Sequence, residues 1–162
     1  MLWSVYIRKA EEAEVKILVS ACLLGENCKY NGGNNYNKNV CEFVNGHQVV
    51  PVCPEVLGGL SIPRCPAEIV NGIVMNREGI CVDREFRSGA EKALAIAKEN
   101  QVEIAILQSR SPSCGGKEIY DGTFSGSKIP GQGVFAKRLM DESIPILDAG
   151  EMENVPYVGW NY

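Results

Sequence analysis

Three short runs of apolar and β-branched residues, each followed closely by a cysteine, limit the possible folds of this chain most strongly. The runs cover residues 15–21, 47–52 and 102–107. Their length and composition are typical of buried strands. An Asn- and Gly-rich loop and a predicted short helix over about residues 37–45 separate the first two runs. The chain therefore begins with the order strand, helix, strand, which is typical of α/β proteins.

The second half of the sequence continues this alternation. Asp83 is the expected N-cap of an amphipathic helix that runs to about residue 100, because apolar residues recur there at spacings of three and four. This helix leads into the third apolar run. A further helix is predicted to open at Gly133, and residues 144–147 form a last predicted strand.

These elements together predict the fold class and the extent of the domain. The order indicates an α/β fold with a mainly parallel sheet flanked by helices, Rossmann-like in arrangement. Turn signals within residues 69–82 add a small hairpin excursion. We expect residues 15–162 to form a single domain, and residues 1–14, which end in a charged run, to be an N-terminal extension.

Composition excludes several classes of protein. A net charge of -4 provides no general basic field for a nucleic acid polymer, and no apolar run approaches the ~20 residues of a membrane span. We therefore expect a cytoplasmic protein that binds neither a nucleic acid polymer nor a membrane.

Seven cysteines, an odd number in a reducing compartment, do not suit a disulfide framework. The one histidine, His47, follows a glycine and is expected to be a turn residue. Metal binding or catalysis by cysteine is the explanation that this composition favours.

Three of the cysteines occupy equivalent positions. Cys22, Cys53 and Cys114 each lie in the loop after one of the three apolar runs. A single cysteine is more often a small buried hydrophobic residue than a ligand. Because the carboxyl ends of parallel strands meet at one edge of a sheet, where ligands bind in open α/β folds, these three thiols are expected to converge.

The spacing of the cysteines leaves the nature of the site open. No Cys-x-x-Cys pair occurs, which weighs against zinc ribbons and thioredoxin motifs. Three separated thiolates suit a cubane iron-sulfur cluster with one open iron, and they also suit a zinc ion with a bound water. Cys28, in the same loop as Cys22, is a candidate fourth ligand or resolving thiol. Cys41, Cys65 and Cys81 are expected to have packing or surface roles.

Three motifs, separated along the chain, carry a specific resemblance to a known family. They are Val19-Ser-Ala-Cys-Leu-Leu-Gly25 with Cys28-Lys-Tyr-Asn-Gly32; Pro51-Val-Cys-Pro-Glu-Val-Leu-Gly-Gly-Leu60 with Pro63-Arg64 and Pro66-Ala-Glu68; and Ser111-Pro-Ser-Cys-Gly115. In these motifs the chain resembles the TudS-type thiouracil desulfidase family, over about residues 16–148. Two positions, Asn31 and Cys65, depart from the family pattern.

The resemblance implies a cofactor and a reaction. It implies a [4Fe-4S] cluster held by Cys22, Cys53 and Cys114, the same residues that follow the predicted strands. The implied reaction is the hydrolytic, non-redox conversion of a thiolated pyrimidine such as 4-thiouracil into uracil and hydrosulfide. It further implies a small thiolated nucleobase as substrate and the cluster-assembly machinery as a partner.

Hydrolysis also needs a group that accepts a proton from water. Glu55, two residues after Cys53, is the candidate base, with Ser111 and Ser113 as hydrogen-bonding partners of substrate or water. The alternative for Glu55 is a capping or ion-paired carboxylate, and for the serines it is a set of hydrogen bonds within a Ser-Pro turn. Arg64 lies in the same motif loops, where a solvated charge is the ordinary case.

Two other functions remain open at the level of sequence. One is a non-catalytic iron-sulfur or zinc protein that carries or senses metal, with Cys28 completing the ligand set. The other is a cluster-free thiol enzyme that uses Cys114 as its nucleophile, activated by loop amides.

Overall fold

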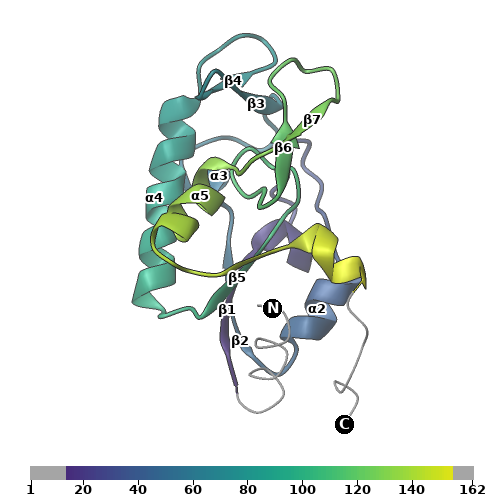
Figure 1. Ribbon diagram of the computed structural model, residues 1–162, viewed down its shortest axis with the longest axis vertical. Helices are drawn as coiled ribbons and strands as arrows, with labels where there is room; N and C mark the ends of the chain where they lie inside the picture. Colours follow the sequence, from purple (N-terminus) through teal and green to yellow (C-terminus); the bar gives the residue numbers. More distant parts are fainter. Residues whose placement is uncertain (1–13, 155–162) are drawn as a thin grey trace.

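A four-stranded parallel sheet forms the centre of the protein. The computed structural model describes residues 14–154 (Figure 1), so most of the predicted N-terminal extension lies outside the described residues. The sheet has the strand order β2-β1-β5-β8, and its strands are β1 (Lys16–Ser20), β2 (Gln48–Val52), β5 (Ile104–Leu107) and β8 (Ile146–Asp148). All three pairings are parallel. The predicted α/β fold with a parallel sheet is therefore confirmed.

Helices cover both faces of this sheet. Alternate residues of β1 point to opposite sides, with Leu18 in one core cluster and Ile17 and Val19 in the other. The first cluster is covered by the helices α4 (Asp83–Glu99) and α5 (Val134–Asp141), and the second by α2 (Lys38–Val44) and the 3₁₀ helices η1 (Ala21–Leu24) and η2 (Ala149–Asn154). Within the described residues, no helix combines the length and apolarity that crossing a membrane requires.

Two hairpins extend beyond the carboxyl ends of the strands (Figure 1). One is the predicted excursion, formed by β3 (Ala67–Val70) and β4 (Ile73–Asn76). The other is formed by β6 (Glu118–Tyr120) and β7 (Lys128–Pro130), in a segment where the sequence pattern predicted no strand. The carboxylate of Glu68 in β3 accepts the backbone N–H groups of Gly122 and Phe124 at 3.0 and 3.1 Å, which fixes the second hairpin against the first.

A close contact between α4 and the short helix α3 (Pro54–Leu57) sets the position of the segment after β2. A Cβ atom at Gly89 would lie 1.8 Å from the carbonyl oxygen of Pro54, and one at Gly58 would lie 2.0 Å from the carbonyl oxygen of Glu85. The two backbones therefore touch, and only glycine allows this approach. The contact holds α3, and the residues at its start, at a fixed place beside the sheet.

The structure contradicts the role predicted for Asp83 and agrees with the one predicted for His47. Asp83 is the first residue of α4 and not its N-cap, which is Val82. Its side chain instead accepts the backbone N–H of Val74 at 3.0 Å, so the carboxylate fixes β4 to the start of the helix. His47 is confirmed as a turn residue between α2 and β2. Its Nδ1 accepts the N–H of Val15, at the end of β1 that is remote from the cysteines.

Candidate active site

The three cysteines that follow the strands line one cavity. Cys22 lies in η1 directly after β1, Cys53 is the N-cap of α3 after β2, and Cys114 lies in the loop after β5. Because β2, β1 and β5 are neighbours in the sheet, these loops meet at one edge. The cavity has a volume of about 420 Å³ and is also lined by Cys28, Cys65 and residues of both hairpins.

Cys28 lies close enough to two of these thiols to change their acidity. The single proton of the Cys28 thiol can be shared with Cys22 or with Cys53, and this side-chain hydrogen bonding is the main reason why the pKa of each falls below its usual value. The pKa of Cys53 falls to about 7, with further help from the backbone N–H of Val56. The same hydrogen bonds raise the pKa of Cys28 itself. Cys28 therefore holds its proton more strongly than Cys22 and Cys53 do.

Cys22 has a second donor that the sequence did not suggest. Nδ2 of Asn35 lies 3.4 Å from its Sγ and also lowers its pKa. Asn35 belongs to an Asn- and Gly-rich loop, and no local pattern distinguishes it from the other asparagines there. Its backbone N–H is bound by the carbonyl of Cys22 at 3.0 Å, which holds the side chain in place.

Cys114 is the most deeply buried of the three ligand candidates. Burial raises its pKa to about 12, and the hydroxyl groups of Ser20 and Ser113 offset only part of this effect. The thiol is consequently protonated at neutral pH when no positive charge is near. This environment disfavours the hypothesis that Cys114 is an activated nucleophile in a metal-free enzyme.

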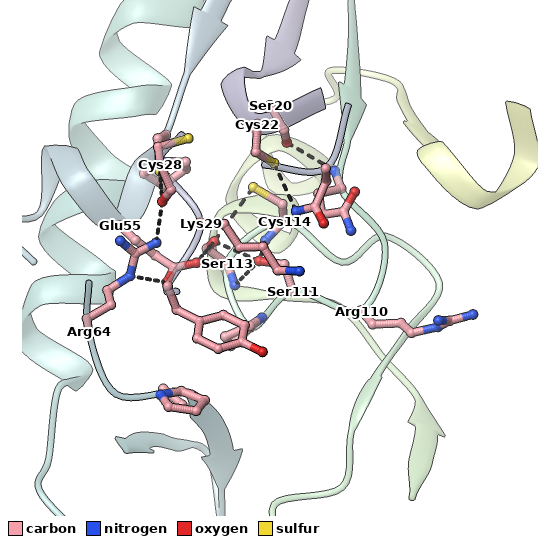
Figure 2. A pocket seen from close by; sticks show the side chains of 18 of the residues that line it. Ser20, Cys22, Cys28, Lys29, Glu55, Arg64, Arg110, Ser111, Ser113 and Cys114 are labelled. Carbon is pink, nitrogen blue, oxygen red and sulfur yellow. Dashed lines mark hydrogen bonds and ion pairs between the residues drawn. The ribbon is translucent and has the colours of Figure 1, made fainter. Parts of the chain in front are cut away.

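Glu55 lies on the wall of the same cavity, in the first turn of α3 (Figure 2). Nε of Arg64 lies 3.1 Å from Oε1 of Glu55, and the hydroxyl of Ser113 donates to Oε2 at 2.9 Å. The carboxylate is thus both ion-paired and directed at the cysteine loop. Arg64 is only 8% exposed, so the expectation of a solvated charge is wrong.

The two candidate serines have different surroundings. Oγ of Ser111 accepts the backbone N–H groups of Ser113 and Cys114 at 3.1 and 3.0 Å, as in a Ser-Pro turn. It also lies 2.9 Å from Oγ of Ser113. With two amides already bound, the hydroxyl of Ser111 serves best as donor to Ser113, and Ser113 then donates to Glu55. Ser111 stabilises the loop, whereas Ser113 is the serine in contact with the carboxylate.

The remaining cysteines lie at different distances from this cavity. Cys41 is in α2 and donates to the carbonyl of Leu23 at 3.7 Å, while Cys81 is exposed. Cys65 is half-buried and lines the cavity, a place that its proline-rich surroundings did not indicate. Within residues 14–154, no three Cys, His, Asp or Glu side chains are arranged as a binding site for a single metal ion.

Comparisons with known proteins agree with this fold. A family model described as 2-thiouracil desulfurase matches residues 17–151. The chain is 40% identical over 149 residues to the uncharacterized protein YbbK of Bacillus subtilis (strain 168), covering 86% of this chain and 99% of the relative.

A solved structure is also similar. It is that of the [4Fe-4S]-dependent thiouracil desulfidase TudS, with a TM-score of 0.81 and 34% identity, and the match covers 86% of this chain and 94% of that one. The family model matches most of the chain, and the relative and the solved structure each match over 86% of it. The chain belongs to the 2-thiouracil desulfurase family.

Proposed function

We propose that this protein removes sulfur from a thiolated pyrimidine by hydrolysis, using a [4Fe-4S] cluster bound by Cys22, Cys53 and Cys114. Thiouracil desulfidation is the activity that the family match and the likeness to TudS support. One observation carries the finer proposal: thiols from three neighbouring strand ends line the same cavity as the Glu55–Ser113 pair.

The donor set suits a cluster. Thiolate sulfur is a soft ligand that favours iron-sulfur centres, and three such ligands leave one iron of a cubane open. Nδ2 of Asn35 donates toward the sulfur of Cys22 at 3.4 Å. The hydroxyl of Ser113 lies 3.6 Å from the sulfur of Cys114. Hydrogen bonds of this kind orient metal ligands and tune the centre that they bind.

When bound, a cluster with an open iron supplies a Lewis acid for the soft sulfur of a thiocarbonyl group. The chain supplies the proton chemistry. Glu55 accepts a proton as water adds to the ring carbon of the substrate, while Ser113 holds the carboxylate in position. The carbon–sulfur bond then breaks and sulfur leaves as hydrosulfide. Over the whole reaction 4-thiouracil and water give uracil, hydrosulfide and a proton, so neither an oxidant nor a reductant is consumed.

Anaerobic reconstitution with iron and sulfide, followed by incubation with 4-thiouracil, tests the proposal. We expect uracil and hydrosulfide in equal amounts from the reconstituted protein and no turnover from the cluster-free protein. Loss of 4-thiouracil absorbance gives the rate, and chromatography identifies uracil. A protein that binds a full cluster but forms no uracil would contradict the proposed function.

The alternative hypothesis, a non-catalytic metal-binding protein, predicts a different metal content. Cys28 lines the cavity with the other thiols and could complete a four-thiolate site. Elemental analysis after anaerobic purification separates the two functions. About one zinc per chain without iron would favour a structural zinc site, whereas about four irons per chain support the cluster.

Some proposals about the wider context follow from the same site. All seven cysteines are free, which suits a reducing compartment such as the cytoplasm. A cavity of about 420 Å³ accommodates a free base. We infer that the cluster-assembly machinery loads the protein. The single domain over residues 15–162 stays a prediction.

A further inference from the structure

Arg64 connects the proposed base to the loop that carries Cys28. Its three guanidinium nitrogens all donate: Nε to Glu55, Nη2 to the carbonyl oxygen of Cys28 at 2.8 Å, and Nη1 to the carbonyl oxygen of Ser61 at 3.2 Å. Figure 2 shows the side chain between Glu55 and Cys28. Its backbone N–H also donates to the carbonyl oxygen of Tyr30 at 2.7 Å.

This arrangement holds the guanidinium group in place, and Arg64 and Ser113 each bind one oxygen of the Glu55 carboxylate. Arg64 is 8% exposed and Glu55 is 16% exposed at their side chains. Two charges removed from water to this degree need each other and their hydrogen bonds, because either one left alone is strongly destabilising. With Oε1 of Glu55 held by Arg64, Oε2 is the oxygen that faces Ser113.

We propose that Arg64 is the positioning residue of the site: it anchors Oε1 of Glu55 to the Cys28 loop so that Oε2 is presented to Ser113 and to the reacting water. Arg64 itself acts only through Glu55. This inference rests on the proposed function, because it assigns Arg64 a part in the same hydrolysis. A lysine at this position would provide the charge but not the planar group with three directed donors.

Steady-state kinetics with 4-thiouracil on the reconstituted protein test the inference. We expect Arg64→Ala to lower the melting temperature and, when assayed below that temperature, to lower kcat by about 100-fold, the loss expected from a misplaced catalytic group, with KM and iron content per folded molecule close to those of the unmodified protein. Arg64→Lys should recover only part of kcat. Millimolar guanidinium chloride should raise kcat of Arg64→Ala, but not that of Glu55→Gln, because the added cation fills the space left beside Oε1.

A double-mutant cycle separates positioning from a structural role. In a Glu55→Gln background, Arg64→Ala should cost no further activity, since both changes remove the same function. The matched control is Arg87→Ala. Arg87 also pairs through Nε with a carboxylate, that of Asp83, and donates through Nη2 to the carbonyl of Gly72, but at an exposed surface. This variant should keep kcat.

The outcomes that overturn the inference differ from those that overturn the function. Unchanged kcat in Arg64→Ala, an additive loss in the double variant, or loss of iron in both Arg64→Ala and Arg64→Lys would reject a positioning role. Each of these results is compatible with an unmodified protein that converts 4-thiouracil. An unmodified, cluster-loaded protein without turnover would instead reject the function and the inference together.

Discussion

The hydroxyl of Ser113 donates to the carboxylate of Glu55 at 2.9 Å, although 58 residues separate them in the chain. Ser113 has one proton, and its oxygen also lies near the sulfur of Cys114 and the hydroxyl of Ser111. Only one of these groups can receive the proton at a time. The position of this single proton therefore links Glu55, the proposed base, to the cysteine loop.

Replacing the two serines should give different defects. Ser113→Ala removes the hydrogen bond to a charged group, worth about 1.5–3 kcal/mol, so we expect kcat to fall by about 10- to 100-fold with unchanged iron content. Ser111→Ala leaves two amides without their acceptor, and we expect a loss of about 1–3 kcal/mol in the free energy of unfolding. Kinetics and thermal melting measure the two effects. The assignment is wrong if Ser111→Ala abolishes turnover without changing the melting temperature.

Removing any one of the three ligand candidates should abolish the cluster. We expect Cys22→Ala, Cys53→Ala and Cys114→Ala to retain little iron and no turnover after anaerobic reconstitution, because each leaves only two of the proposed thiolates. Cys41→Ala and Cys81→Ala are the controls, since one thiol lies in α2 and the other is exposed. Iron retained by Cys22→Ala would show that Cys28 binds in its place.

The cluster-free protein should show a large contrast in thiol reactivity. The pKa of Cys53 is lowered to about 7, mainly by the hydrogen bond from Cys28, and burial raises that of Cys114 to about 12. Because thiolates are the reactive form, iodoacetamide should modify Cys53 with a rate that rises through pH 7, while Cys114 stays unmodified. Mass spectrometry of the peptides measures both.

Cys28→Ala provides the check on this explanation. Removing the Cys28 thiol should raise the pH at which the modification rate of Cys53 is half-maximal, toward the ordinary thiol pKa of about 8.5. If the pH of half-maximal modification does not change in Cys28→Ala, another group lowers the pKa of Cys53.

The contact between α3 and α4 should be intolerant of one added methyl group. In Gly89→Ala the new Cβ would meet the carbonyl oxygen of Pro54, a backbone atom that cannot turn aside. Overpacking of this kind costs about 3 kcal/mol, which corresponds to a melting temperature lower by about 10 °C at this chain length. Because Cys53 and Glu55 lie at the start of α3, iron binding should weaken as well.

Glu99→Ala, an exposed change near the end of the same helix, is the control for this variant. It should melt within about 2 °C of the unmodified protein, as most surface substitutions do. If Gly89→Ala has the same melting temperature as the unmodified protein, α3 can move away from α4 without a loss of stability.

The parts of the fold that were predicted correctly depend on local patterns. The apolar runs of β1, β2 and β5 are β-branched and bounded by loop residues, and α4 has a clear helical period, so each was visible in a short window. The cavity could be anticipated for the same reason. Once three strands are parallel neighbours, the residues that follow them meet at one edge.

The missed features depend on contacts between distant segments. β6 and β7 have three residues each and α3 has four, which is too short for a period to appear. From the sequence alone, Arg64 is expected to be a solvent-exposed loop cation. Its burial arises because Glu55 and the carbonyl of Cys28, nine and 36 residues away, converge on it only in the folded protein.

The separation of Cys22, Cys53 and Cys114 along the chain has a consequence for biosynthesis. During translation the last of these thiols leaves the ribosome only after three of the sheet's four parallel strands, β1, β2 and β5, and no fragment that ends before β5 contains all three. The three sulfurs therefore meet in one cavity only when β2, β1 and β5 have paired side by side. Metal loading on this protein would be restricted to molecules that have already reached their native topology.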